Sequence, residues 1–332
     1  MKQLLTRARL PLELALWAGF AAVPWIAPDQ VLLFSQIAIL ALLAISLDLL
    51  VGHAGIVSLG HAAFFGLGAY IASLLPLSGW EEPLTGLVAA ALLAGLVGAL
   101  TAPLVVRAGG LTQLMVTLCL CLLLHEAASR ARWLTGGDDG LSGFMLKPIF
   151  GIFEFDIFGN TAYGYALAVT AIGFLLYTLL IASPFGYALR GLRQNPLRMA
   201  ALGTDGRKRL IQAYVMAAML AGCAGGLLAQ TTQSVSLEAL SFQRSAEVLI
   251  VLIIGGAGGR YGGLVGAVIY TLARDWLAIA SPQYWIGWLG ALMVVVVLLA
   301  PRGVTGLLGR IGQMLMRTPA GEPAQQTRER TP

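Results

Sequence analysis

The sequence contains few charged residues. Asp, Glu, Lys and Arg make up 11% of its 332 residues, whereas 58% are hydrophobic and 41 residues are glycine. Because soluble domains carry about 25% charged residues, an ordinary soluble domain is excluded, and the surplus apolar surface requires lipid. The net charge of +5 is concentrated in short stretches and forms no broad basic face. We therefore expect a lipid bilayer around the chain and no nucleic acid as a partner.

Cysteine frameworks and catalytic motifs are also missing. Cys119, Cys121 and Cys223 all lie inside apolar runs, which excludes a disulfide framework and a CxxC metal site. No lysine has the preceding glycine and the following Ser or Thr of a phosphate-binding loop, so the chain encodes no ATP site. The HExxH and GxSxG motifs of hydrolases are absent. We expect no catalytic residue, no metal and no cofactor in this chain.

Long apolar runs are what the sequence does contain. A helix crosses about 30 Å of hydrocarbon with roughly 20 apolar residues, and ten runs approach this length. Seven are good candidates: residues 31–51, 55–75, 84–105, 111–127, 162–182, 210–230 and 284–300. Three are weaker because they are short or contain charge: 12–26 with Glu13, 245–258 with Glu247, and 262–280 with Arg274 and Asp275. The sequence predicts an all-α integral membrane protein with about ten transmembrane helices.

The first run, 12–26, has a second interpretation. It follows Lys2, Arg7 and Arg9, and a basic start before an apolar core is typical of a signal peptide. However, the run ends in Pro24-Trp25-Ile26-Ala27-Pro28 without a small-x-small cleavage pattern. A tryptophan at this place suits the membrane interface, so we favour a membrane span.

Basic residues between the runs indicate orientation, because they accumulate on the cytoplasmic side. Basic residues dominate the N-terminus, the loop 183–209 and the tail, whereas in 128–161 four acidic residues stand against three basic ones. An even number of spans satisfies all of these assignments and places both termini in the cytoplasm. We expect a transmembrane domain over 1–312, with 183–209 cytoplasmic and 128–161 periplasmic. Residues 313–332 lack apolar periodicity and are predicted to form a disordered cytoplasmic tail.

Two glycine-rich stretches interrupt the apolar pattern and are candidate helix breaks. Such density permits either close helix packing or an interrupted helix, and the sequence leaves both open. The glycines concerned are Gly52, Gly55 and Gly60 in the first stretch, and Gly255, Gly256, Gly258 and Gly259 in the second.

Polar side chains inside apolar spans need a reason, because facing lipid would be unfavourable. Ser58, His61 and Gln230 are therefore candidates for lining a path across the membrane. His53 and His61 are eight residues apart and would not share a helical face, which argues against a metal pair. The sequence shows no obvious carboxylate-binding arginine at the centre of a span. The acidic candidates Asp48, Glu126 and Glu247 lie near predicted span ends.

The loop 183–209 predicts a docking element for a soluble partner. Asn195 is a good N-cap and Pro196 a good first residue for a short helix that ends near Gly203. An exposed positive-inside loop alone would also explain its arginines. The residues predicted to dock are Arg190, Arg193, Asn195, Pro196, Leu197, Arg198, Ala201, Leu202 and Gly203.

Five motifs resemble those of the LivM-type permeases of bacterial ATP-binding cassette (ABC) importers for branched-chain amino acids and related solutes. Together they span residues 50–310. They are GxxSLGHAAFFGLGAY at Gly55–Tyr70, LRGLRQNPLRMAALG at Leu189–Gly203, LLAQ ending at Gln230, LIIGGAGGRYGGLVGA at Leu252–Ala267, and PRGVTGLLG at Pro301–Gly309.

This resemblance implies an inner-membrane permease that works by alternating access. Its partners would be a homologous LivH-like permease, two cytoplasmic ATPase subunits that bind ATP and Mg, and a periplasmic solute-binding protein. The short helix in 183–209 would then seat in a groove of an ATPase. Five spans on each side of 128–161 make an inverted repeat plausible. Relatives that carry other small polar solutes leave the substrate open, and an ion-coupled secondary transporter of small organic solutes is the alternative.

Overall fold

The computed structural model describes residues 17–149, 151, 153–154, 156, 159–299 and 303–307. The predicted N-terminal basic residues and the tail 313–332 lie outside the described residues. Within the described part the chain is almost entirely helical, as the sequence predicts for an all-α membrane protein. The described part also contains an antiparallel two-stranded ribbon, β1 (Leu141–Ser142) with β2 (Ser234–Val235), and connecting loops.

Among the described residues, six helical stretches are long and apolar enough to cross a membrane. They are Pro28–Ala54, α5 (Pro83–Arg107), α6 (Leu111–Arg130), α8 (Asn160–Ala182), α11 (Gly206–Thr232) and α13 (Gly262–Ala280). Two shorter apolar helices accompany them, α4 (His61–Leu77) and α14 (Trp285–Leu299). All six long stretches overlap predicted runs. The structure therefore supports an all-α membrane protein.

The remaining elements are short or lie at the ends of the long helices. The stretch Pro28–Ala54 is built from η1 (Pro28–Gln30), α3 (Val31–Asp48) and the π-helical turn η2 (Leu49–Ala54). The others are α2 (Val23–Ile26), α7 (Arg132–Thr135), η3 (Gly137–Asp139), α9 (Pro184–Gln194), α10 (Pro196–Ala201), η4 (Leu237–Leu240) and α12 (Phe242–Gly255).

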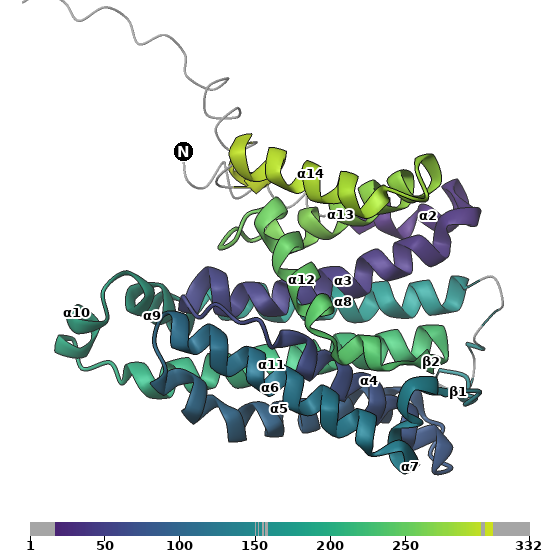
Figure 1. The fold of residues 1–332 in the computed structure, drawn as a ribbon, viewed down its shortest axis with the longest axis horizontal. Helices are drawn as coiled ribbons and strands as arrows, with labels where there is room; N and C mark the ends of the chain where they lie inside the picture. Colours follow the sequence, from purple (N-terminus) through teal and green to yellow (C-terminus); the bar gives the residue numbers. More distant parts are fainter. Residues whose placement is uncertain are drawn as a thin grey trace, which may run out of the picture.

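The long helices run side by side along the longest axis of the molecule (Figure 1). The helices α9 and α10 project from one end, which we call the α9–α10 end. The ribbon β1–β2 and α7 lie at the opposite end, the β1–β2 end. Because apolar helices of this length must cross the hydrocarbon, this axis is the membrane normal and the two ends are the two aqueous faces.

Small residues let α11 pack at the centre of the bundle against α3, α4 and α5. At Gly68 on α4 a side chain would collide with the backbone of Gly222 on α11. At Gly225 on α11 it would collide with the carbonyl of Phe65. Without a hydrophobic driving force between helices in lipid, such close backbone approach is what stabilises their packing. These glycines fix the distance between α4 and α11.

The helix predicted over 55–75 begins six residues late, at His61. Gly55 has a left-handed backbone with φ of 75°, which ends η2, and the chain runs without regular structure to Gly60. Likewise α12 ends where Gly256 takes a φ of 105°. Of the weak run 12–26, only residues 17–26 are described, and these are mostly helical. The first glycine interruption thus leaves α4 starting inside the fold, whereas the second ends α12 before the turn that leads to α13.

Candidate functional site

Two helices begin inside the bundle and meet there. The backbone N–H of Ala62, in the first turn of α4, donates a hydrogen bond of 2.9 Å to the hydroxyl of Ser245 in the first turn of α12. His61 Nε2 lies 2.7 Å from the hydroxyl of Ser46 on α3. Ser46 precedes the end of η2 by eight residues, so His61 lies about 12 Å inside the α9–α10 end. The two N-termini and α3 therefore form one buried junction.

The segment that leads into α12 enters the bundle from the β1–β2 end. After β2, the turn η4 is mostly buried, and the hydroxyl of Ser241 caps α12 by accepting from the N–H of Arg244 at 3.1 Å. The segment that leads into α4 enters from the opposite end, where Gly55 lies against the Arg193 side chain. The chain thus reaches the junction once from each aqueous face.

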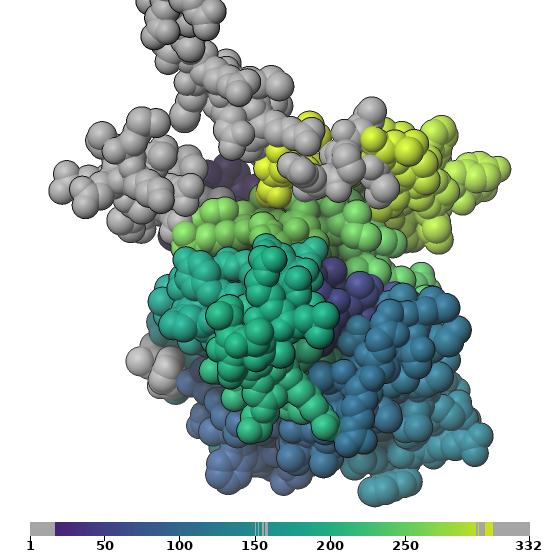
Figure 2. All heavy atoms as spheres, turned by 90° about the vertical axis from the view of Figure 1, so that its left-hand side faces the viewer, coloured from purple at the N-terminus to yellow at the C-terminus, as the bar shows by residue number. Residues whose placement is uncertain are grey.

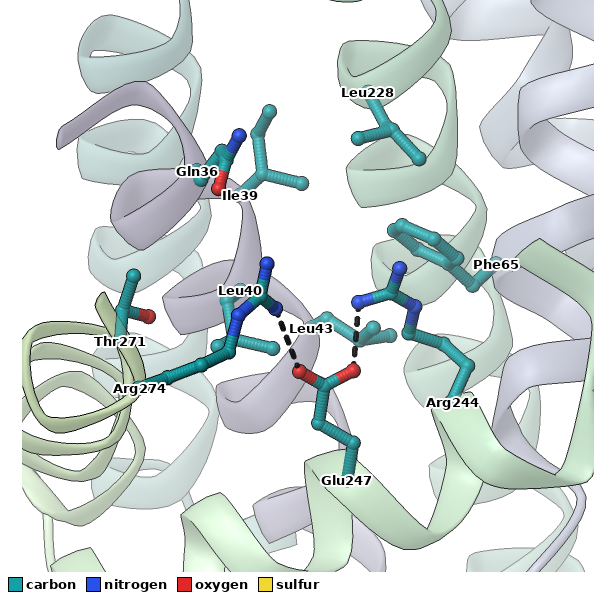
Figure 3. Close-up of a pocket in the computed structure, with 10 residues that line it drawn as sticks. All are labelled: Gln36, Ile39, Leu40, Leu43, Phe65, Leu228, Arg244, Glu247, Thr271 and Arg274. Atoms are coloured by element: carbon teal, nitrogen blue, oxygen red, sulfur yellow. Dashed lines mark hydrogen bonds and ion pairs between the residues drawn. The ribbon is translucent and has the colours of Figure 1, made fainter. Parts of the chain in front are cut away.

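A triad of charged side chains lies beside this junction. Glu247 on α12 accepts from Arg244 at 2.6 Å and from Arg274 on α13 at 3.3 Å, one guanidinium on each carboxylate oxygen (Figure 3). Arg244 also reaches the exposed Glu238 at 3.2 Å. The Glu247 side chain is 13% exposed and that of Arg274 is 39% exposed. One end of the triad is therefore inside the protein, and the other opens to its surroundings.

The triad lines one side of a partly open cavity of about 130 Å³. Its other walls come from α3, α4, α11 and α13, and Figure 3 shows the charged groups gathered on one side of it. The lining residues are Gln36, Ile39, Leu40, Leu43, Phe65, Leu228, Arg244, Glu247, Thr271 and Arg274. Two buried polar atoms of these residues have no hydrogen-bond partner within the described part of the chain, namely Thr271 Oγ1 and Arg244 Nε. The cavity thus offers both charges, a free hydroxyl and an apolar wall.

The sequence did not reveal this triad. The segment 245–258 reads as a short span with Glu247 near its end, and Arg244 falls just outside it. Only the buried turn η4, which carries the chain back into the bundle before α12 starts, brings these residues to the interior. The sequence signal that was available is the pair Arg244 and Glu247, one helical turn apart and close to Ser241 as a cap.

The three predicted path residues are fully buried. His61 belongs to the junction, and Ser58 accepts a hydrogen bond of 3.3 Å from the N–H of Gly60. Gln230 on α11 donates to the carbonyl of Pro83 at 2.7 Å and accepts from the Tyr165 hydroxyl at 2.8 Å. In this conformation Gln230 connects α11 to α5 and α8. That these three residues line a path stays a prediction.

The seven predicted helix-break glycines occupy different positions. Gly52 lies within η2, where it is packed so closely against Gly258 that no side chain would fit. Gly60 directly precedes α4, and Gly255 is the last residue of α12. Gly55, Gly256 and Gly258 have positive φ, whereas Gly259 lies in the turn between α12 and α13.

A second polar cluster holds the two glycine stretches together at the α9–α10 end. Asp48, at the end of α3, is 1% exposed and accepts hydrogen bonds from the Tyr177 hydroxyl and, at 2.7 Å, from the N–H of Gly258. Nδ1 of His53 lies 3.7 Å from the same carboxylate. Arg193 on α9 donates to the carbonyl of Gly52. The projecting helix α9 is therefore bonded directly to the backbone of the first glycine stretch.

The predicted docking loop forms two helices instead of one. Ser183 and Pro184 start α9, which the sequence analysis did not anticipate, although a serine before a proline is a helix-start signal. Asn195 caps α10 by accepting from the N–H of Arg198 at 3.0 Å. Leu197 and Leu202 are 83% and 73% exposed.

The rest of the loop leads from α10 into α11. Asp205 caps α11, and a hydrogen bond from the N–H of Lys208 lowers the pKa of the Asp205 carboxyl. Arg190 donates to the carbonyl of Ile181 at 3.0 Å, and Gly203 turns the chain with a φ of 79°. Viewed from this end, the teal segment that includes α9 and α10 stands forward, beside a recess in which part of the purple N-terminal segment is visible (Figure 2).

Fold and site together define a helical, multi-pass membrane protein with interrupted helices and a projecting pair of short helices. Residues 31–298 match the family described as the permease component of branched-chain amino acid transport systems, so the chain belongs to this family. It is a multi-pass inner-membrane permease. No solved structure matches the chain.

Relatives with assigned functions are transport permeases rather than enzymes. The chain is 28% identical over 290 residues to the high-affinity branched-chain amino acid transport system permease protein LivM of Escherichia coli K12, which covers 79% of this chain and 67% of that protein. The LivM protein of Salmonella typhimurium LT2 is 29% identical with the same coverage. A probable LivH permease of Methanocaldococcus jannaschii is 26% identical over 285 residues, 81% of this chain and 89% of that protein.

Proposed function

We propose that this chain is a transmembrane permease subunit of an ABC importer that moves branched-chain or related amino acids inward. Separate ATPase subunits, which bind ATP and Mg, would drive alternating access. Membership of the permease family and the names of the relatives support the substrate class. The observation that carries the coupling is the projecting pair α9–α10, with Leu197 and Leu202 exposed at its tip. Exposed apolar side chains on a projecting helix favour contact with a protein partner.

The contacts of α9 supply a route for coupling. A partner that moves α10 displaces α9, and α9 is bonded through Arg193 to the carbonyl of Gly52. Gly52 in turn packs against Gly258 in the turn between α12 and α13. A shift of the docking helices therefore acts on both interrupted segments at once. Rigid helices joined at glycine turns favour such movement between discrete arrangements.

The proposed membrane topology assigns the α9–α10 end and the β1–β2 end to opposite sides of the membrane. The α9–α10 end would face the cytoplasm with both termini, and the β1–β2 end with 128–161 would face the periplasm and its solute-binding protein. A LivH-like permease would complete the transmembrane pair. We retain about ten spans as part of this proposal, with α4, α12 and α14 as the shorter ones. The tail 313–332 would be cytoplasmic.

An inverted arrangement of two halves is consistent with the interrupted helices. The segment before α4 enters from one aqueous face and the segment before α12 from the other, and the two helices meet at the contact of Ala62 with Ser245. Helices related in this way are typical of transporters with inverted repeats, which bind solute near the middle of the membrane. We propose that α4 and α12 occupy corresponding positions in the two halves.

The ion-coupled alternative requires a carboxylate that can take up a proton or sodium ion. Asp48, which is buried, and Glu247, which is partly buried, are the acids of interest, and both are held by hydrogen-bond donors. Glu126 lies on the surface, paired with Arg130 at 2.6 Å. No contact among the described residues favours ion coupling over an ATPase-driven importer.

The experiment that tests the proposal is affinity purification of the tagged chain, expressed with its chromosomal neighbours, in a mild detergent. We expect a P-loop ATPase and a second permease to co-elute and the complex to hydrolyse ATP. Recovery of the chain alone would contradict the proposal if solute uptake also survives ATP depletion and collapses with the ion gradient.

A further inference from the structure

We propose that the cavity beside Glu247 is a solute subsite within the membrane that binds the zwitterionic head group of an α-amino acid. The inference rests on the proposed function, since it gives the permease a binding step of its own in addition to that of a solute-binding protein. It assigns the charged groups of the solute to Arg244, Glu247 and Arg274. It assigns the aliphatic side chain of the solute to the apolar wall of the same cavity.

The first argument is depth. The turn between α12 and α13 lies at the α9–α10 end, where Gly258 touches Asp48. Arg244 precedes Gly255 by eleven residues and Arg274 follows Gly262 by twelve, which at 1.5 Å per residue places both about 17 Å from that end. Because the hydrocarbon is about 30 Å thick, both residues start from backbone positions near its middle. Ionisable side chains at this depth face a watery path or a partner and mark functional sites.

The second argument is that the cavity contains hydrogen-bonding groups with nothing to bond. Thr271 is 4% exposed, and its hydroxyl oxygen has no partner within the described residues. Nε of Arg244 is also buried without one. Leaving a buried donor or acceptor unpaired is unfavourable, because the group has lost its hydrogen bonds to water. A ligand that fills the cavity would satisfy groups that the protein itself leaves unpaired.

The third argument is chemical complementarity. A guanidinium offers five N–H donors, and the contact of Arg274 with Glu247 uses only part of that set, so Arg274 retains donors for a carboxylate. Glu247, with the amide oxygen of Gln36 across the cavity, offers acceptors for an ammonium group. The cavity is also lined by apolar side chains, which include Phe65 and Leu228. The cavity therefore offers a positive and a negative group beside an aliphatic surface. This combination fits an amino acid with a branched aliphatic side chain better than it fits a solute that is a neutral amide.

The fourth argument is that the cavity walls belong to helices that are connected to the docking helix α9. Glu247 and Arg274 lie on α12 and α13, which are joined by the glycine turn that contacts Asp48 and Arg193. Leu43, five residues before Asp48, lies on α3. A displacement of α9 would therefore change the spacing of the cavity walls. This would allow a bound solute to be released when the ATPases close.

The test uses the purified complex of permeases and ATPases, without binding protein or nucleotide, immobilised for scintillation proximity. Radiolabelled L-leucine is the probe, added up to millimolar concentration. Leucinamide, which lacks the carboxylate, and 4-methylpentanoate, which lacks the ammonium group, serve as competitors. We expect L-leucine to bind and unlabelled L-leucine to displace it at least about tenfold more effectively than either analogue, because each analogue loses one set of charge-assisted hydrogen bonds.

Two variants separate a binding role from a structural one. Thr271→Val keeps the shape of the side chain and removes a hydroxyl that has no hydrogen-bond partner among the described residues. A structural role therefore predicts unchanged or higher thermal stability and unchanged binding. We expect the same stability with about tenfold weaker leucine binding. Glu247→Gln should lower the affinity for leucine more than the affinity for 4-methylpentanoate. The reason is that only leucine carries the ammonium group that Glu247 is proposed to bind. The matched controls are Thr178→Val, whose hydroxyl bonds only to its own helix, and the exposed Glu126→Gln.

The results distinguish failure of the proposed subsite from failure of the proposed importer function. The subsite is overturned if the wild-type complex does not bind L-leucine. It is also overturned if the Thr271→Val and Glu247→Gln complexes bind L-leucine as tightly as the wild-type complex does. If the same complex still takes up leucine at the expense of ATP when its binding protein is added, the proposed function stands without the subsite. If it does not, the proposed function fails as well.

Discussion

The carboxylate of Asp48 accepts a hydrogen bond of 2.7 Å from the backbone N–H of Gly258, which lies 210 residues further along the chain. The Tyr177 hydroxyl, from α8, donates to the other carboxylate oxygen. This contact joins the two glycine-rich stretches at the end where α9 projects. A buried carboxylate is stable only when its oxygens are paired, so the contact fixes the relative position of α3, α8 and the turn between α12 and α13.

Tyr177→Phe tests this cluster. The substitution leaves one buried oxygen of Asp48 without its donor, and we expect the free energy of unfolding to fall by about 1–3 kcal/mol. Thermal unfolding of the detergent-solubilised chain measures the change. The control is Tyr187→Phe, which removes a hydroxyl from a side chain that is 66% exposed. Equal melting temperatures for the two variants would contradict a stabilising role of the Tyr177 hydroxyl.

Gly68→Ala tests the close packing of α4 on α11. The added methyl group would collide with the backbone of Gly222, so we expect destabilisation of about 1–3 kcal/mol and a lower melting temperature. Gly164→Ala on α8 is the matched control, because no atom lies within 4 Å of its added carbon. Alanine is the better helix former, so this control should be neutral or slightly stabilising. A Gly68→Ala protein as stable as the control would show that the helices can separate without penalty.

Ala201→Asp combined with Leu202→Asp tests docking by α10. Both residues are exposed, so we expect normal membrane insertion and stability but loss of the co-purifying ATPase. Two carboxylates in an apolar contact lose their hydration without gaining partners. The control carries Trp133→Asp and Met145→Asp, which are 86% and 81% exposed and precede or follow β1 at the other end. Normal ATPase recovery with the first variant would rule out α10 as the docking element.

Reporter fusions test the topology. A reporter enzyme that is active only in the periplasm should be silent when fused after Gly203 or at the C-terminus, and active when fused after Gly140. The reason is the excess of basic residues in 183–209 against the acidic residues of 128–161. Immunoblots of each fusion control for expression. Activity of the C-terminal fusion would contradict this topology, because it would require either an odd number of spans or a reversed orientation of the whole chain.

Some features of the fold follow directly from local sequence. The run 84–105 predicts α5, and 210–230 predicts α11, because an uninterrupted apolar stretch has no alternative to a helix in lipid. Asn195 and Pro196 predict the start of α10, because a cap needs only groups three residues apart. These signals are local, so one sequence is enough to read them.

Other features depend on partners that are distant in sequence. Glycine density alone does not distinguish packing from interruption, and the structure uses Gly68 for packing and Gly55 for interruption. Glu247 reads as a charge near a span end, because nothing in its neighbourhood reveals that η4 returns the chain into the bundle. In the sequence, Arg274 only weakens the prediction of a span over 262–280. Its partner Glu247 lies 27 residues away on another helix, so the pattern around Arg274 does not reveal the ion pair.

The sequence by itself determined that the chain lies in a membrane, is helical, and carries a capped helix in a basic loop, because composition, hydropathy and capping act over one or a few turns. Only the tertiary structure decided which ends of the interrupted helices meet, which glycines contact each other, and which charges surround a cavity. The physical reason is that a buried polar group must find its partner wherever the fold provides one. Such partners here come from segments separated by up to 210 residues.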